Sequence, residues 1–243
     1  MYKLTDKKDN IDRLKNDKPM EQLFMIKNNE PELLLFFAGW GMNERPFARI
    51  RPAGCDWMIC YDYRSPEFDD TLLQAYSRIT LIGWSMGVWA ATQVMRRFPD
   101  LPVTQSIAIN GTPYPIDETR GIPPSIFEGT LQGLNEQTLR KFRRRMCGSA
   151  DEYEAFADVM PQRTAEELKE ELESIRRQYD ALPAPAFRWR QAVVGTDDRI
   201  FPPANQLRAW SGTTDVTQTE AAHYSRSLFE NLLTNRQITN VHG

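Results

Sequence analysis

The sequence predicts an α/β fold in which helices cover both faces of a mainly parallel, doubly wound sheet. Short apolar runs bounded by turn residues recur along the chain, and helical patterns separate several of them. A long polar stretch without strand pattern interrupts this series. Strands that alternate with helices favour parallel pairing, because a parallel neighbour is reached only through a crossover. The 243 residues suit one such domain.

The predicted strands of the first half are short and apolar. They are EQLFMIK, PELLLFFAG, WMICYDY, ITLIGWS and SIAIN. The first two are separated by the turn-forming residues NNEP, and a modest helical pattern over 71–78 precedes the fourth. The fourth strand leads at once into a predicted helix over 86–98, which Pro99 stops. This order is typical of a strand, turn and helix unit.

Residues 113–185 differ in character, because they are polar, rich in helix formers and punctuated by proline. We expect them to form a helical cap inserted into a domain that spans residues 20–243. The strand pattern resumes in FRWRQAVVGTDD, and a helix near 203–210, a weaker strand and a last amphipathic helix follow. Residues 1–19 lack an apolar period and are expected to form a flexible extension.

The composition excludes several classes of function. The formal net charge of −3 provides no general attraction to nucleic acid. No apolar run approaches the ~20 residues of a membrane-spanning helix, and the N-terminus lacks the apolar stretch of a secretory signal. We therefore expect a soluble, cytoplasmic protein. The three cysteines have no metal-binding spacing and predict neither a zinc site nor a disulfide framework.

A serine nucleophile is indicated by residues 83–87, GWSMG, which fit the pattern G-x-S-x-G. The motif lies between a buried strand and a predicted helix, and this context is typical of the sharp turn that presents a nucleophilic serine above a sheet. The helix behind Ser85 adds the positive end of its dipole. We therefore predict that Ser85 is the nucleophile of a hydrolase.

A serine hydroxyl needs a neighbouring base, and His223 is the natural candidate because His242, the other histidine, lies next to the C-terminus. The third member is expected to be a carboxylate after a strand and before His223 in chain order. Residues Asp197 and Asp198 both close the strand RQAVV. We prefer Asp198 for its spacing from Gly195, and the neighbouring aspartate stays open as the alternative.

An oxyanion hole requires two backbone donors aimed at the developing negative charge. The amide of Met86, directly after the nucleophile, is expected to supply one of them. The second is expected from the Trp40 amide, in a turn whose flanking glycines let the chain pass close to a substrate. Trp84 and Phe127 are predicted walls of an acyl pocket, since one adjoins the nucleophile and the other lies in the cap after a proline pair.

Several motifs together resemble the BioG-type esterases from residue 20 onward. They are FFAGWGM at 36–42, GWSMG at 83–87, GIP at 121–123, RMCG at 145–148 and IFPPANQ at 200–206. The resemblance implies the α/β-hydrolase fold and a pimeloyl-acyl carrier protein methyl ester esterase of biotin synthesis that needs no cofactor. It places the catalytic triad at Ser85, Asp198 and His223. The alternatives are a thioesterase, a small-ester carboxylesterase or a non-catalytic ligand-binding protein of this fold.

The resemblance suggests a function for a run of cations in the insertion. The run consists of Arg140, Lys141, Arg143, Arg144 and Arg145. Such runs are usually solvated surfaces, but the resemblance implies that an acidic acyl carrier protein, bearing the pimeloyl methyl ester, docks at the cap. A compact basic patch would steer that partner despite the negative net charge.

Overall fold

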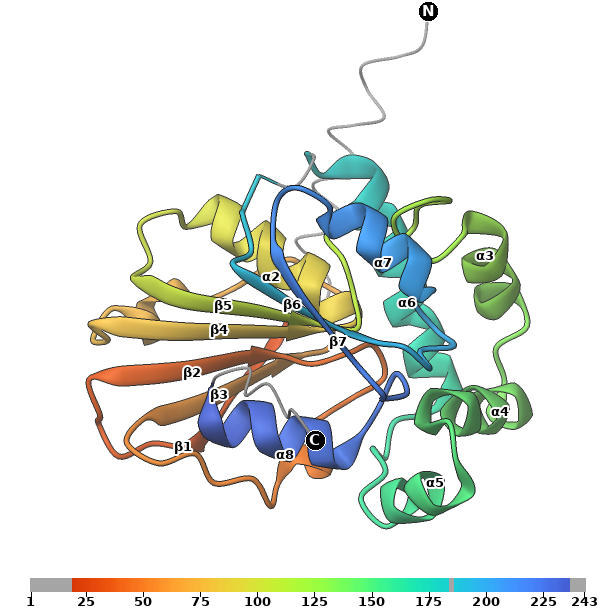
Figure 1. Cartoon of the computed structure of the whole chain (residues 1–243), viewed down its shortest axis with the longest axis horizontal. Helices are drawn as coiled ribbons and strands as arrows, with labels where there is room; N and C mark the ends of the chain where they lie inside the picture. The colour runs from red at the N-terminus through yellow and green to blue at the C-terminus, as the bar shows by residue number, and fades with distance from the viewer. Residues whose placement is uncertain (1–18, 184–185, 237–243) are drawn as a thin grey trace, which may run out of the picture.

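Figure 1 shows the computed structural model of the chain, in which residues 19–183 and 186–236 are described. Within these residues, seven strands form one sheet in the order β1-β3-β2-β4-β5-β6-β7. The strands are β1 (Glu21–Ile26), β2 (Glu32–Phe37), β3 (Asp56–Tyr61), β4 (Arg78–Trp84), β5 (Val103–Ile109), β6 (Gln191–Gly195) and β7 (Asp215–Thr219). Only β1 and β3 pair antiparallel among them. The prediction of a mainly parallel, doubly wound sheet is confirmed.

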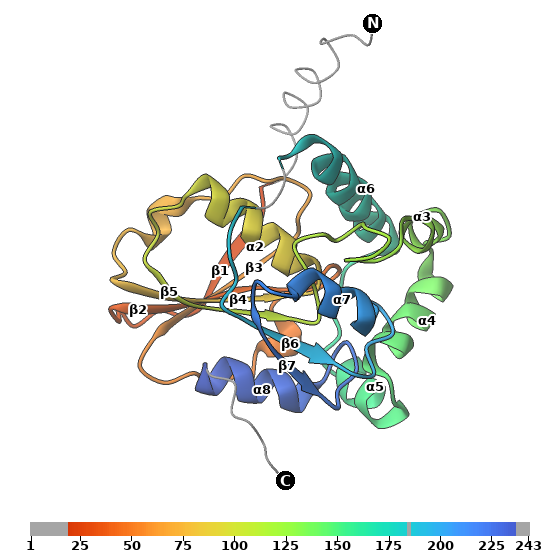
Figure 2. The ribbon, with the colours of Figure 1, turned by 45° about the horizontal axis from the view of Figure 1, so that its top comes forward.

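Helices cover both faces of this sheet and its carboxyl edge. They are α2 (Met86–Arg97), α3 (Pro124–Gln132), α4 (Glu136–Cys147), α5 (Ala150–Ala157), α6 (Ala165–Ala181), α7 (Pro203–Trp210) and α8 (Arg226–Asn235). The helices α2 and α8 lie on opposite faces in both views (Figures 1 and 2). The predicted N-terminal extension lies outside the described residues, apart from residue 19.

The centre of the sheet explains the longest apolar run of the sequence. Strand β2 lies between β3 and β4 and is buried from Leu33 to Phe37. A strand covered on both faces needs apolar side chains in both directions, which is why the run does not alternate. The helical pattern at 71–78 forms only a short 3-10 turn, η2 (Asp70–Leu73), because β4 already begins at Arg78.

The cap helices α3, α4, α5 and α6 lie beyond the carboxyl ends of the strands (Figure 2). Capping boxes start two of them: Asn135 forms one with Thr138 on α4, and Thr164 forms one with Glu167 on α6. The inward face of α6 carries Leu168, Leu172 and Ile175. The polar sequence therefore forms amphipathic helices that pack above the carboxyl edge of the sheet, where the loops with the predicted catalytic residues meet.

Candidate active site

The turn between β4 and α2 holds Ser85 in a backbone conformation that few residues adopt, with φ 58° and ψ −126°. Its amide donates to the carbonyl of Ile109, 3.0 Å away, and its carbonyl accepts from the amide of Val88 at 3.1 Å. A Cβ on Gly87 would stand 2.2 Å from the carbonyl oxygen of Phe37. The second glycine of the motif is therefore required by the close approach of α2 to β2.

The side chains of the three predicted catalytic residues form a continuous chain of hydrogen bonds. Nε2 of His223 lies 2.9 Å from Oγ of Ser85, and Nδ1 lies 2.9 Å from Oδ2 of Asp198. An ionised carboxylate can only accept, so Nδ1 carries the proton and Nε2 accepts from the serine hydroxyl. All three residues are buried, and Phe201 stacks on the imidazole with an interplanar angle of 7°. The geometry suits nucleophilic catalysis.

Four donors hold the carboxylate of Asp198. Its Oδ1 accepts from the amides of Ile200 and Phe201 at 2.8 and 2.9 Å, and Oδ2 accepts from Nε2 of Gln206 at 2.9 Å besides the histidine. Asp197 is exposed and lies outside this chain of bonds. The structure thus brings Asp198, and not its neighbour, to His223.

Sequence reasoning missed Gln206 as part of the site. This glutamine is fully buried on α7, and Nε2 also donates to the carbonyl of Phe201 at 2.8 Å. It therefore fixes both the carboxylate and the turn that carries it. The signal was present in the motif IFPPANQ, where a glutamine sits on a helix that follows the acid loop closely.

Asn110, at the end of β5, was also missed. Its Nδ2 donates to the carbonyls of Ala222 and His223 at 3.0 Å each, and its Oδ1 accepts from the amide of Gly195 at 2.7 Å. One buried side chain therefore joins the strand beside the nucleophile to the acid and histidine loops. A lone asparagine after a strand gives no sequence signal for such a role.

The two predicted oxyanion donors lie on either side of the nucleophile. Met86 is the first residue of α2, so its amide has no acceptor within the helix. Gly39 precedes Trp40 and lies against the nucleophile, since a Cβ on this glycine would stand 3.3 Å from Cβ of Ser85. Among the described residues, neither the Trp40 nor the Met86 amide donates to the protein. Their role as an oxyanion hole stays a prediction.

A pocket above the triad is lined by Ser85, His223 and the two predicted wall residues. Its space, the open mouth included, is about 570 Å3. Trp84 and Phe127 are almost fully buried, and the indole Nε1 of Trp84 donates to the carbonyl of His223 at 3.0 Å. Trp84 therefore supports the histidine loop as well as the pocket. A largely apolar chamber of this kind suits an acyl chain.

The predicted basic patch needs one correction. Arg140, Lys141, Arg144 and Arg145 are exposed on α4, but Arg143 is only 6% exposed. At 3.6 residues per turn, Arg143 shares the inward face of α4 with Leu139 and Met146, and its Nη1 lies 2.9 Å from Sδ of Met160. This burial lowers the pKa of its guanidinium. The patch is therefore four residues, and Arg143 belongs to the packing of the cap.

Two exposed cations also line the pocket. One is Arg145, from the predicted patch, and the other is Arg199, directly after the acid. The sequence around Arg199 does not indicate a role in the pocket, because this residue reaches α4 only when the loop after β6 packs against the cap. The pocket mouth consequently carries positive charge from two elements.

Residues 19–183 and 186–236 contain no group of three or more His, Cys, Asp or Glu side chains able to hold a metal ion. The helices in these two ranges include none that is both long and apolar enough to cross a membrane. The three cysteines are buried free thiols, and burial raises the pKa of Cys147 to about 12.

The family model described as pimeloyl-ACP methyl esterase BioG matches residues 20–234. The chain belongs to the BioG family. A crystal structure of BioG from Haemophilus influenzae is similar to this chain with a TM-score of 0.79 and 36% identity, covering 87% of this chain and 97% of that one. An uncharacterised H. influenzae protein is 38% identical over 200 residues, which are 81% of this chain and 90% of that protein.

A Bacteroides fragilis protein named malonyl-[acyl-carrier protein] O-methyltransferase is 57% identical over 205 residues, or 83% of this chain. The match spans 41% of that protein, about two fifths of its length. More distant structures show the fold alone. A non-heme bromoperoxidase from Mycobacterium tuberculosis has 13% identity and a TM-score of 0.61, covering 90% of this chain and 94% of that one. The BioG-family chain therefore has the α/β-hydrolase fold that its motifs predicted.

Proposed function

We propose that the protein is a serine carboxylesterase that hydrolyses the methyl ester of a pimeloyl group carried on acyl carrier protein, for biotin synthesis. The observation that carries the proposal is the hydrogen-bonded chain from Ser85 through His223 to Asp198 beneath a largely apolar pocket. Membership of the BioG family supports the choice of ester. The B. fragilis relative, by its name, acts on a malonyl group on the same kind of carrier.

In the proposed reaction, Oγ of Ser85 attacks the carbonyl carbon of the terminal methyl ester while Nε2 of His223 takes its proton. The amides of Trp40 and Met86 donate to the oxyanion that forms. The bond to the methoxy oxygen then breaks, and the histidine returns the proton so that methanol leaves. Asp198 holds the proton on Nδ1 and stabilises the imidazolium.

The second half of the reaction regenerates the enzyme. A water molecule gives its proton to His223 and attacks the acyl carbon, and the bond to Oγ of Ser85 breaks as the serine regains a proton. The product is a free terminal carboxylate that is still joined to its carrier through the thioester. These steps use the serine, the histidine and water, and they call for no cofactor.

We also propose that acyl carrier protein docks on the exposed cations of α4. These are Arg140, Lys141, Arg144 and Arg145. All four lie on the cap helix α4, which also contributes Arg145 to the pocket lining. An acidic carrier would be steered to this surface and would present its acyl group toward Ser85.

The direct test is mass spectrometry of pimeloyl-carrier methyl ester after incubation with the purified protein. We expect the loss of one methylene from the acyl-carrier, and no loss with the Ser85→Ala variant. Release of the whole acyl group from the carrier would instead identify a thioesterase. Equal efficiency on a free dimethyl ester would remove the carrier from the proposal and leave a small-ester carboxylesterase.

A further inference from the structure

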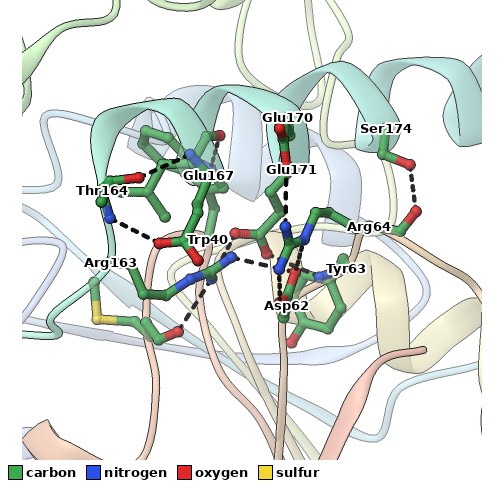
Figure 3. Close-up of polar contacts among 12 residues, drawn as sticks. Trp40, Asp62, Tyr63, Arg64, Arg163, Thr164, Glu167, Glu170, Glu171 and Ser174 are labelled. Carbon is green, nitrogen blue, oxygen red and sulfur yellow. Dashed lines mark hydrogen bonds and ion pairs between the residues drawn. The ribbon is translucent and has the colours of Figure 1, made fainter. Parts of the chain in front are cut away.

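The segment 38–42, which carries the predicted oxyanion donor Trp40, is held by the cap helix α6 (Figure 3). The indole Nε1 of Trp40 donates to the carbonyl of Leu168 at 2.9 Å. At the other end of the segment, Nη1 of Arg163 approaches the carbonyl of Met42 at 3.4 Å. Arg163 directly precedes Thr164, the N-cap of α6, so the two contacts come from this helix and from the residue that leads into its cap.

Glu171 links these contacts to the start of the segment. Its side chain is fully buried: Oε2 pairs with Nη1 of Arg163 at 2.8 Å, and Oε1 accepts from the amide of Tyr63 at 2.9 Å. The hydroxyl of Tyr63 in turn donates to the carbonyl of Ala38 at 2.6 Å. Glu171 is therefore connected to residue 38 through Tyr63 and to residue 42 through Arg163, on either side of Trp40.

The arginine is also held from its other side. Nη2 of Arg163 lies 3.2 Å from Oδ1 of Asp62, and Asp62 binds Arg64 with both carboxylate oxygens. Arg64 also pairs with Glu170 of α6 (Figure 3). A guanidinium bracketed by two carboxylates has little freedom, so its contact with the carbonyl of Met42 is fixed in place.

An apolar side chain at position 171 would pack this interface at a lower desolvation cost. Burial raises the pKa of the Glu171 carboxyl, and the charge of Arg163 and the amide of Tyr63 only partly oppose this. A buried ion pair often gives no more stability than apolar residues of similar volume. The ion pair instead fixes a position, because its hydrogen bonds determine where the segment 38–42 lies relative to Ser85.

We infer that Glu171, together with Arg163, is a positioning residue that sets the Trp40 amide at the oxyanion site. The inference rests on the proposed serine hydrolase mechanism, and it makes the cap helix part of the catalytic arrangement. Glu171 does not line the pocket that contains Ser85. Its effect must therefore appear in the transition state, through the donor that it places, more than in the binding of substrate.

The test is the Glu171→Gln variant, assayed with p-nitrophenyl butyrate and by the rate at which a fluorophosphonate labels Ser85. The substitution keeps the shape of the side chain but removes the charge that holds Arg163. Because a lost oxyanion donor lowers kcat about 10²–10³-fold, we expect a displaced one to lower kcat at least about tenfold. KM should change less than about twofold, and labelling should slow with kcat. The matched control is Glu173→Gln on the exposed face of α6, which should behave as wild type.

A Glu171→Gln variant that melts at a lower temperature but keeps kcat and its labelling rate in the folded protein would overturn the inference. If that variant does not fold, Tyr63→Phe decides, since it removes the hydroxyl that donates to the carbonyl of Ala38 and keeps the amide that donates to Glu171. Unchanged kcat in Tyr63→Phe would then overturn the inference, and a lowered kcat with unchanged KM would support it. Failure of wild-type Ser85 to be labelled would instead refute the proposed function, whatever the variants do.

Discussion

Two buried aspartates at opposite ends of the sheet have similar surroundings and different consequences. Asp198 follows β6 at the carboxyl edge, and Asp56 begins β3 at the amino edge. Each carboxylate accepts two backbone amides on one oxygen and two side-chain donors on the other. The number of hydrogen bonds therefore does not distinguish the predicted catalytic aspartate from one that only supports the fold.

The two aspartates differ in what their side-chain donors bind in turn. The side-chain donors to Asp56 are the hydroxyl of Tyr76 at 2.6 Å and Nζ of Lys27 at 3.2 Å, and Lys27 itself binds the same tyrosine. These three side chains bind one another, and their contacts connect the start of β3 to neighbouring turns. The donors to Asp198 include an imidazole whose second nitrogen continues to Ser85. A buried carboxylate acts in chemistry when one of its donors changes protonation during the reaction.

The largest effect that tests this comparison is the loss of the nucleophile or its base. We expect Ser85→Ala and His223→Ala each to lower kcat about 10⁶-fold, with little further loss in the double variant, because triad members act as one unit. Circular dichroism and thermal melting should show folded proteins. A Ser85→Ala variant with substantial turnover would contradict the nucleophile assignment.

Asp198→Asn should lower kcat about 10⁴-fold, since an amide in place of the carboxylate favours the wrong histidine tautomer. The matched control is Asp197→Asn, which changes an exposed neighbour of the same type. We expect this control to keep kcat within about twofold of wild type. If the order of the two losses were reversed, the acid of the triad would be Asp197.

Asp56→Asn should do the opposite and lower stability while leaving turnover intact. The substitution leaves buried donors such as the Tyr76 hydroxyl poorly paired, which costs about 1–3 kcal/mol of unfolding free energy. Urea unfolding measures this loss. The kcat for a small ester, measured well below the melting temperature, should remain near wild type, and a large fall in kcat would break the proposed division between the two ends of the sheet.

The same aspartate gives stability a pH dependence of defined sign. Burial raises the pKa of the Asp56 carboxyl, but hydrogen bonds from Tyr76 and the amides of Asn28 and Glu30 outweigh it and hold the pKa at about 2. An unfolded aspartate has a pKa of about 3.9, so the folded state binds fewer protons between these values. The contribution of the Asp56 carboxylate to the unfolding free energy is complete above about pH 4 and is lost as the pH falls toward about 2.

Unfolding free energies of wild type and Asp56→Asn, measured from about pH 5 down to about pH 2, check this sign. The difference between the two proteins should shrink as the pH falls, because the wild-type carboxyl becomes protonated and loses its advantage. A difference that stayed constant through this window would show that the charge of Asp56 does not contribute.

How much the sequence revealed depended on how local the signal was. Ser85 sits in a five-residue motif between a strand and a helix, and His223 was singled out by the scarcity of histidine, so both were predicted. Gln206 lies eight residues from the aspartate that it binds and was overlooked within a motif that had been recognised. The basic patch was predicted from cations that are adjacent in sequence. The 3.6-residue period of a helix instead places Arg143 on the inward face with Leu139.

The site residues that could not be predicted from sequence bind partners that are far away along the chain. Asn110 binds the carbonyl of a residue 113 positions away, and Glu171 binds the amide of a residue 108 positions away. Buried polar residues of this kind are placed by the packing of the cap and loops on the sheet. Their partners become apparent only in three dimensions, since any exposed asparagine or glutamate has the same local sequence appearance.

The smallest expected effect concerns charges whose proposed partner lies outside the molecule. Arg140 and Arg144 are one turn apart on the exposed side of α4, and neither lines the pocket. If they recruit an acidic carrier, changing both to glutamate should raise KM for the carrier-bound methyl ester by about tenfold and slow association. Added salt should reproduce the effect in wild type by screening charges over ~8–10 Å.

Hydrolysis of p-nitrophenyl butyrate by the same double variant should stay near wild type, because Ser85 and the predicted oxyanion donors are unchanged. Equal losses on both substrates would show that the two arginines support the fold of the cap, as buried Arg143 does. No loss on either substrate would leave them as a solvated surface. A loss confined to the carrier-bound ester is the outcome that separates recruitment from structure, because only that substrate brings an acidic surface to α4.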